Sequence, residues 1–427
     1  MESKGANHMQ KIKEKANRCE MCTKPGCIVG CPLDNDIKGF IKSVKEENYK
    51  EAYNILSKTT VLESVCGRVC PHEKQCQGAC LREIKKSPVK IGALEAFVGD
   101  LAIKNNWKIR GKTNSAHHVA VVGGGPAGLT CAAFLKKNGI NVTIYEKHDH
   151  LGGLLYHGIP SFRLPRDITE KTIKKIIDLG IEVKYNEVLG KTITLKQLER
   201  KYDAVFISIG ANMPNKMKIP GEKLKGVYGG NAFLENKTEL DCQDKTIIVL
   251  GGGNVSIDVA RTVKRKGAKN VIIVYRKEEA ELTADLDEVM AAKKDGVKFI
   301  FKNNIIKILG KNKVKGVELI KTRYKKVDGK ELLENVRGSR HKMDCDYVIS
   351  AIGSHANRRT MNSLNLELTK NGKIKIDKKG HTSKKKVFAG GDAAGSIGTV
   401  AWAARAGRNA AYEIIEYLKK KEGNKNV

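Results

Sequence analysis

The sequence predicts an α/β protein in which a helical N-terminal domain precedes two nucleotide-binding units. Two stretches, 119–146 and 246–277, each run from an apolar strand through a glycine-rich turn into a helix and a second strand. Eight of the eleven cysteines come before residue 81, around a stretch, Ile37–Leu56, with apolar residues at helical spacing. At 427 residues the chain is long enough for two or three domains with their own cores.

Composition narrows the class of protein. No run approaches the roughly 18 apolar residues of a membrane span, and the N-terminus has no apolar segment typical of a signal peptide, so we expect a cytoplasmic protein. The net charge of +32 is one indication of nucleic-acid binding. Aromatic residues make up 5% and do not interleave with the basic runs, so we favour lysines on solvated faces. Such a surface would also steer an acidic redox partner such as a ferredoxin.

The cysteines of the N-terminal segment predict metal clusters. Disulfides are disfavoured in a cytoplasmic chain, and zinc, the remaining alternative, prefers compact pairs, of which Cys19/Cys22 is one. The first group ends at Cys31-Pro32, a detail of bacterial ferredoxin motifs in which that cysteine serves a second cluster. We therefore expect two [4Fe–4S] clusters. The cysteines of this segment are Cys19, Cys22, Cys27, Cys31, Cys66, Cys70, Cys76 and Cys80.

The first nucleotide unit follows. Val119–Val122 is predicted to be a buried strand, the turn 123–128 leads into a helix through Leu135, and Asn141–Tyr145 is a second strand that ends at Glu146. This order is typical of the dinucleotide-binding βαβ unit. The stretch 203–210 is a further apolar strand that ends at a glycine.

Three glycines of the first turn have separate roles in such a unit. Gly123 allows the tight turn, Gly125 lets the backbone approach a pyrophosphate, and Gly128 lets the helix pack close to the strand. The phosphates are expected at the helix N-terminus, where unpaired N–H groups and the helix dipole favour anions. Glu146 is expected to accept hydrogen bonds from the adenosine ribose. We therefore predict a dinucleotide site here.

The second unit differs from the first at two places. After the strand Ile247–Leu250 and the turn, Ser256 stands where the first unit has its third glycine. The strand Val271–Tyr275 ends in Arg276-Lys277, where NAD-selective folds have an acid. Because an arginine can hold the 2′-phosphate of NADP with two hydrogen bonds, we favour NADPH, with NADH and a merely exposed Arg276 as alternatives.

The C-terminal part is expected to complete the first unit. The stretch 347–353 is predicted to be a strand that returns to the first domain, and Val387–Ala389 leads through glycines to Asp392. A carboxylate at a strand end could bond the polyol linker of a flavin, while a simple helix cap is the alternative. An alanine-rich helix follows from about Thr399. The isolated Cys131, Cys242 and Cys345 are expected in the core.

Taken together, these motifs resemble the family of glutamate synthase small (beta) subunits, over essentially the full length. This family also includes the NADPH-binding subunit of NADH-dependent ferredoxin:NADP oxidoreductase and the N-terminal flavoprotein part of dihydropyrimidine dehydrogenase. The matching segments are RCEMCTKPGCIVGCPL, VCGRVCPHEKQCQGAC, IGALE, GGGPAGL, GGLLYHGIPSFRLP, GGGNVSIDVAR, YRK and FAGGDAAG.

The resemblance implies an all-helical iron–sulfur domain, then a glutathione-reductase-like FAD domain with an inserted NAD(P)H domain of Rossmann type. The implied ranges are 1–115 for the helical domain, 116–245 and 346–427 for the FAD domain, and 246–345 for the NAD(P)H domain. It implies one cluster on Cys19, Cys22, Cys27 and Cys80, and another on Cys31, Cys70, Cys76 and the carboxylate of Glu95. Cys66 is then not a ligand.

The expected cofactor-binding residues are, for FAD, Gly123, Gly125, Pro126, Ala127, Gly128, Glu146, Gly153, Arg163, Gly391, Asp392 and Thr399. For NADPH they are Gly251, Gly253, Asn254, Ser256, Arg276 and Lys277. Family members have arginine where Lys277 stands, and lysine lacks the planar fork of arginine, which weakens the preference for NADPH.

The implied activity is that of an FAD-dependent NAD(P)H oxidoreductase that passes electrons to a larger or second redox subunit. Hydride transfer to a flavin needs positioning and electrostatics, so no acid–base residue is predicted. The 251–348 stretch lacks the Cys-x-x-Cys of thioredoxin reductases, and no length remains for an FMN barrel. The partner is expected to resemble the glutamate synthase large subunit. Alternatives are a bifurcating ferredoxin-reductase type, a pyrimidine-reducing type and, from another class, a basic nucleic-acid-binding iron–sulfur protein.

Overall fold

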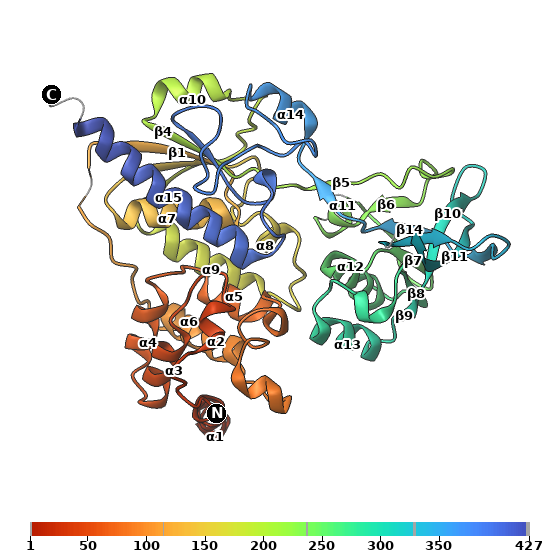
Figure 1. Ribbon diagram of the computed structural model, residues 1–427, viewed down its shortest axis with the longest axis horizontal. Helices are drawn as coiled ribbons and strands as arrows, with labels where there is room; N and C mark the ends of the chain where they lie inside the picture. The colour runs from red at the N-terminus through yellow and green to blue at the C-terminus, as the bar shows by residue number, and fades with distance from the viewer. Residues whose placement is uncertain (1, 114, 236–237, 328–329, 424–427) are drawn as a thin grey trace. The chain divides into compact units, whose positions relative to one another are not determined.

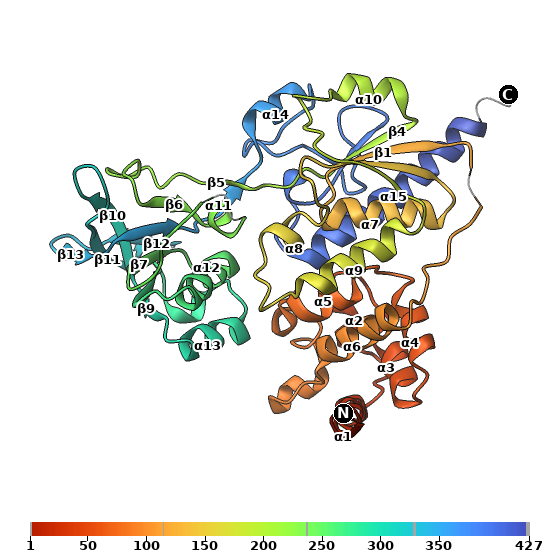
Figure 2. The same cartoon turned by 180° about the vertical axis from the view of Figure 1, so that it is seen from behind.

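A computed structural model describes residues 2–113, 115–235, 238–327 and 330–423 (Figures 1 and 2). The chain forms two compact units. The first consists of Met1–Tyr156, Ser161–Ala211 and Ala356–Val427, and the second of His157–Pro160 and Asn212–His355. The first unit therefore contains both the cysteine-rich segment and the first glycine turn.

The regular elements of the cysteine-rich segment, within the described residues 2–113, are all helices joined by loops, as predicted. The expected helical stretch is divided in two because Asn48 caps a new helix, its side chain accepting a hydrogen bond from the Glu51 N–H. The elements are α1 Glu2–Asn17, α2 Gly26–Val29, α3 Ile37–Lys45, α4 Tyr49–Leu56, α5 Glu63–Val69, η1 His72–Lys74, η2 Leu81–Lys85 and α6 Ile91–Lys104.

The rest of the first unit is built on a five-stranded parallel sheet of order β16-β4-β1-β2-β3. The helices α7 and α15 lie side by side in both views. The strands are β1 His118–Val122, β2 Asn141–Tyr145, β3 Glu182–Lys184, β4 Ala204–Ile207 and β16 Val387–Ala389. The helices are α7 Pro126–Lys137, α8 Leu154–His157, α9 Arg166–Ile177, α10 Leu195–Lys201, α14 Arg358–Ser363, η4 Asp392–Ala394 and α15 Val400–Gly423.

The second unit has a parallel sheet of the same size, of order β6-β14-β7-β8-β9, with helices on one face and an antiparallel sheet packed on the other. Its strands are β5 Met213–Pro214, β6 Val227–Gly229, β7 Thr246–Leu250, β8 Asn270–Val274, β9 Lys298–Ile300, β10 Asn303–Leu309, β11 Gly316–Val327, β12 Lys330–Asn335, β13 His341–Asp344, β14 Tyr347–Ser350 and β15 Ser354–His355. Its helices are α11 Gly230–Leu234, α12 Asn254–Arg265, η3 Glu279–Glu281 and α13 Leu286–Lys294.

One sequence-based expectation about strand order is wrong. The stretch 347–353 was expected to return to the first domain, but β14 pairs in parallel with β7 and β6 of the second unit. The predicted ranges 246–345 and 346–427 therefore divide this sheet, and the compact unit extends from Asn212 to His355. An apolar strand carries no mark of the sheet that it joins, because its pairing partners are remote in sequence.

Other expectations are confirmed. The isolated Cys131, Cys242 and Cys345 are all buried. Across the described residues, every helix is too short or too polar to cross a membrane.

Candidate functional site

The first glycine turn has the geometry that the sequence predicts. It follows β1, the central strand of its sheet, and leads into α7. Gly123 has a φ of 102°, and a Cβ on Gly128 would lie 1.9 Å from the Gly123 carbonyl oxygen. A Cβ on Gly125 would meet nothing nearer than the Gly153 Cα at 4.0 Å. The turn is thus closed where the helix meets the strand and open where a pyrophosphate would lie.

Glu146 is held against this turn. Its residue is 3% exposed, and its two carboxylate oxygens accept hydrogen bonds from the backbone N–H groups of Gly124 (2.7 Å) and His148 (3.0 Å). Burial raises the pKa of Glu146, and these two hydrogen bonds oppose the shift. The carboxylate therefore shapes the turn as well as standing at the predicted ribose position.

The segment after β2 packs beside the turn. The Gly152 N–H donates to the Gly124 carbonyl (2.8 Å), and a Cβ on Gly153, whose φ is 52°, would lie 3.0 Å from the Gly125 Cα. Gly153 thus lies against the first glycine turn. Arg163 lies in the turn between α8 and α9.

Two further residues predicted to bind FAD, Gly391 and Asp392, follow β16. Because its strand is parallel to β1 and β2, Asp392 lies at the same edge of the sheet as the glycine turn. Gly391, with φ 70°, would place a Cβ 3.2 Å from the Ala127 Cβ. Burial raises the pKa of Asp392, and Lys373 opposes the shift. The N-cap of η4 is Gly391 rather than Asp392, so the simple capping role does not apply.

Thr399 lies immediately before α15. Its hydroxyl accepts a hydrogen bond from the Trp402 N–H (3.4 Å), which satisfies one donor of the first helical turn. The predicted start of this helix is confirmed.

The second turn repeats the arrangement with one difference. Gly251 has a φ of 140°, and a Cβ on Gly253 would meet only the Thr283 hydroxyl, at 3.4 Å. Ser256 is fully buried, and its hydroxyl donates to the Gly253 carbonyl (2.6 Å). The Asn254 side chain accepts a hydrogen bond from the Asp285 N–H (2.8 Å), which ties α12 to the start of α13.

The two basic residues after β8 are not equivalent. The Lys277 ammonium pairs with Glu281 at 3.0 Å, and the Tyr324 hydroxyl donates to the same carboxylate. Arg276 is exposed, and none of the ion pairs in the described part of the chain involves its guanidinium. Of the two, Arg276 remains the predicted contact for a 2′-phosphate.

The four cysteines of the first predicted cluster share one pocket. Cys19, Cys22, Cys27 and Cys80 all line it, although Cys80 is more than fifty residues from the others. Burial, together with the neighbouring cysteines, raises the pKa of Cys27 to about 11. Four cysteines are the donor types that a [4Fe–4S] cluster requires, and the thiolates form when the metal displaces their protons. Among the described residues no three such side chains are close enough to hold a single metal ion, so the pocket brings the cysteines to one place without setting them as ligands of one ion.

The residues of the second predicted ligand set influence one another electrostatically. Burial raises the pKa of Cys31 to about 12, with Glu95 and Cys70 adding to the shift. Burial also raises the pKa of Cys76, and Glu95, Cys31 and Cys70 add to that shift. Burial raises the pKa of Glu95 to about 8. Cys66 lies beside this group, and its thiol hydrogen-bonds to Cys70.

Sequence reasoning missed three residues. The Ser208 hydroxyl, at the end of β4, donates to the Val122 and Gly123 carbonyls (3.1 and 3.0 Å) and so holds the first turn. Arg405 and Arg408 of α15 bond the segment that follows Cys31. Two arginines three positions apart in an alanine-rich helix were the available signal, because such residues share one helix face.

The family patterns agree with this geometry. Residues 117–407 match the pattern of the pyridine nucleotide-disulphide oxidoreductases. Residues 2–107 match the pattern described as dihydropyrimidine dehydrogenase domain II, 4Fe-4S cluster.

Curated relatives match nearly the whole chain. The small chain of glutamate synthase (NADPH) from Escherichia coli is 34% identical over 95% of this chain and 91% of its own length. The PreT subunit of NAD-dependent dihydropyrimidine dehydrogenase from E. coli O157:H7 is 34% identical over 95% of this chain and 94% of its own. The beta subunit of NADP(+)-dependent formate dehydrogenase from Moorella thermoacetica is 34% identical over 92% of this chain and 60% of its own.

Among solved structures, FprA of Mycobacterium tuberculosis in complex with NADPH superposes with a TM-score of 0.64 at 20% identity, over 73% of this chain and 86% of that one. The thioredoxin reductase of T. acidophilum gives a TM-score of 0.54 at 21% identity, over 71% and 98%. At this identity the likeness supports the fold.

Proposed function

This chain belongs to the family of glutamate synthase small chains, and from that premise we propose that it is the NAD(P)H-oxidising electron-input subunit of a larger enzyme. Electrons would pass from NADPH through FAD and two [4Fe–4S] clusters to a partner subunit. The glutamate synthase large subunit is the partner that the full-length relatives favour.

The chain's own residues have separate tasks in this function. Gly125 and the first turn of α7 would receive the FAD pyrophosphate, with Glu146 and Asp392 at opposite sides of the turn. Gly253 and Arg276 would bind the nicotinamide nucleotide. FAD, when bound, supplies the conversion between a two-electron hydride and single electrons. The protein's contribution is to position both nucleotides, and no side chain is required as acid or base.

The observation that carries the proposal is the pocket shared by Cys19, Cys22, Cys27 and Cys80. A flavoprotein that only reduced a soluble acceptor by hydride transfer would not need four thiols brought together from two distant segments. Their place in the same compact unit as the flavin turn favours single-electron transfer onward from the flavin. We propose that Cys31, Cys70, Cys76 and Glu95 hold the second cluster.

Anaerobic reconstitution with iron, sulfide and FAD tests the function directly. We expect about eight iron atoms per chain, a flavin absorbance that NADPH bleaches, and an EPR signal from reduced clusters. Serine variants of Cys22 and Cys70 should each remove one cluster, while Cys242→Ser, a buried cysteine far along the chain, should keep both. A colourless protein after reconstitution would contradict the proposal.

The second candidate function is electron input to a different partner. It is favoured by the similarity, equal in identity, to the dihydropyrimidine dehydrogenase and formate dehydrogenase subunits. Anaerobic affinity purification from the native cell separates the candidates. A stoichiometric partner with an N-terminal amidotransferase cysteine would establish glutamate synthase, while a barrel or ferredoxin-reductase-like partner would exclude it.

A further inference from the structure

The helix α15 joins the two redox sites of the first unit. Thr399, which immediately precedes it, is one of the residues predicted to bind FAD. A Cβ on Gly407 would lie 2.0 Å from the Ala127 carbonyl oxygen, so α15 packs directly against α7. In both views α15 runs along α7, and its start is the end nearer the N-terminal helices (Figures 1 and 2). Two arginines of this helix, Arg405 and Arg408, reach the segment that follows Cys31.

The contacts of the two arginines are to backbone carbonyls. Arg405 donates to the Pro32 carbonyl at 2.7 Å, and Arg408 donates to the Leu33 carbonyl and, at 3.1 Å, to the Thr59 carbonyl. Both arginines also pair with the Asp34 carboxylate, at 3.3 and 3.1 Å. Because Arg408 is 6% exposed, its bonds are shielded from water and stronger than surface contacts.

One of these peptide groups also faces the Cys31 sulfur. The backbone N–H groups of Asn35 and Leu33 donate to that sulfur. The Leu33 N–H and the Pro32 carbonyl belong to one planar peptide, so Arg405 holds the carbonyl end of the group whose N–H end bonds Cys31. The arginine charge also polarises that peptide and strengthens the N–H as a donor.

Arg408 supports the other side of the ligand group as well. It holds the Thr59 carbonyl, the Thr59 hydroxyl donates to the Asn35 side chain at 2.6 Å, and the Asn35 amide donates to Glu95 at 3.3 Å. One buried guanidinium thus supports both the Cys31 segment and the carboxylate proposed as its companion ligand.

We propose that Arg405 and Arg408 are positioning residues for electron transfer, which set the reduction potential of the Cys31 cluster and hold it at a fixed place relative to the flavin helix. Hydrogen bonds to cluster sulfurs and nearby positive charge both favour the reduced, more negative cluster. The inference rests on the proposed function, since it assumes that Cys31 is a cluster ligand.

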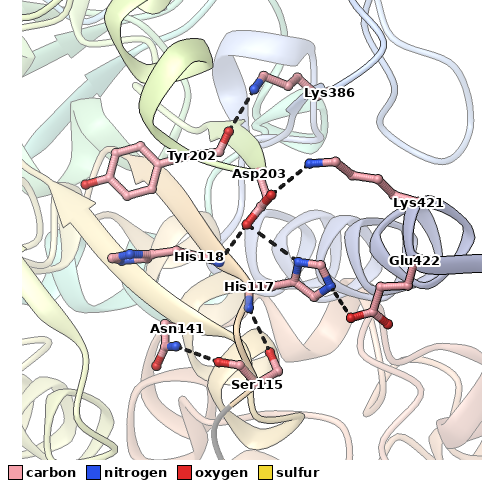
Figure 3. Close-up of polar contacts among 9 residues, drawn as sticks. All are labelled: Ser115, His117, His118, Asn141, Tyr202, Asp203, Lys386, Lys421 and Glu422. Carbon is pink, nitrogen blue, oxygen red and sulfur yellow. Dashed lines mark hydrogen bonds and ion pairs between the residues drawn. The ribbon is translucent and has the colours of Figure 1, made fainter. Parts of the chain in front are cut away.

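The opposite end of the same helix provides a matched control. Lys421 pairs with Asp203 at 2.8 Å, and the His117 ring lies between Asp203 and Glu422 (Figure 3). Lys421 is thirteen residues beyond Arg408, which along a helix is about 20 Å. A Lys421→Met variant therefore removes one unit of charge and one anchor from α15 without touching the cysteine segment.

The experiment compares Arg405→Met, Arg408→Met, Arg405→Lys and Lys421→Met in the reconstituted full chain. Three quantities are measured: iron and sulfide content, cluster midpoint potentials by EPR-monitored titration, and the rate of flavin reduction by NADPH. We expect Arg405→Met and Arg408→Met to shift one cluster to a more negative potential and to slow the appearance of its reduced signal after NADPH is mixed in. Flavin reduction should keep the wild-type rate.

The variants separate the possible roles. Arg405→Lys, which keeps the charge, should recover part of the shift, and Lys421→Met should have wild-type potentials. If Arg408→Met does not fold, Arg405→Met, at a more exposed position, decides the question. Potentials in Arg405→Met equal to those of Lys421→Met would overturn the inference. A wild-type chain without clusters or flavin bleaching would instead overturn the proposed function.

Discussion

The two glycine turns are close in sequence pattern but differ in how tightly the protein closes them. In the first turn, helix and strand meet at Gly128, where even one added carbon would strike the Gly123 carbonyl. In the second, Ser256 fits at the equivalent position and bonds the Gly253 carbonyl. The first turn is also bonded by the buried Glu146, whereas the second is followed by the exposed Arg276.

This difference matches the two nucleotides that we propose. A cofactor that stays bound through many turnovers benefits from a rigid site whose donors are already in place. A nucleotide that must leave after each hydride transfer is better served by an exposed charge at the rim, because such a contact forms and breaks readily. The physical distinction is that the buried Glu146 is hydrogen-bonded within the fold, whereas the side chain of Arg276 is exposed to solvent and to an incoming ligand.

The largest expected effect comes from moving the serine of the second turn into the first. In Gly128→Ser the new Cβ meets backbone 1.9 Å away, which cannot yield without moving the strand. We expect a loss of about 3 kcal/mol or more in stability and of most bound FAD, measured by thermal unfolding and flavin absorbance. The reciprocal Ser256→Gly should cost about 1 kcal/mol and keep FAD. Equal losses of stability in Gly128→Ser and Ser256→Gly would show that the two turns are closed equally tightly.

The next effect is expected at Glu146. A glutamine side chain at this position has one carbonyl oxygen for two backbone N–H donors, so in Glu146→Gln either Gly124 or His148 would face an amide N–H₂. An unmet buried hydrogen bond costs about 1–3 kcal/mol. Because that bond holds the turn expected to receive the FAD pyrophosphate, FAD should bind about tenfold more weakly or worse. Titration of FAD into the apoprotein measures this. Glu187→Gln, near the surface, should bind FAD normally.

A smaller and more selective effect is expected at Arg276. Arg276→Ala should raise the KM for NADPH about tenfold, the value of one charge-assisted contact, and should leave the KM for NADH unchanged. Lys277→Ala should change either KM less, because the Lys277 ammonium is already paired with Glu281. Steady-state kinetics with both nucleotides tests this. An equal loss with NADH would show that Arg276 does not read the 2′-phosphate.

The smallest effect is a pH dependence in the first unit. Burial raises the pKa of Asp392, so the folded protein keeps this proton to a higher pH than the unfolded chain. Stability should therefore fall as the pH rises from about 4 through the raised pKa. Asp392→Asn should flatten that part of the profile, measured by urea unfolding of the apoprotein at several pH values. If the pH dependence of stability were the same in Asp392→Asn and the wild type, burial would not raise the pKa of Asp392.

Much of the fold followed from local patterns. Both glycine turns, the strands beside them and the helical N-terminal segment were predictable, because strand and helix periodicity and the spacing of glycines involve residues close in sequence. Glu146 was predictable as the acid after the second strand, although its bond to Gly124 was not. The buried cysteines outside the clusters were predictable from their isolation.

What the sequence by itself determined is the chemistry of each site: glycines and an acid at one nucleotide, a base at the other, and eight thiols at the N-terminus. Tertiary structure decided which distant segments meet. Only the structure shows that Tyr347–Ser350 joins β7, that Cys80 shares a pocket with Cys19, and that Arg408 is buried against Leu33. These are pairings between residues far apart in the chain. Because the entropy of closing a loop depends only weakly on its length, many distant segments could pair at a similar cost. Packing in the folded protein selects among them, and a local sequence pattern does not show which partner is selected.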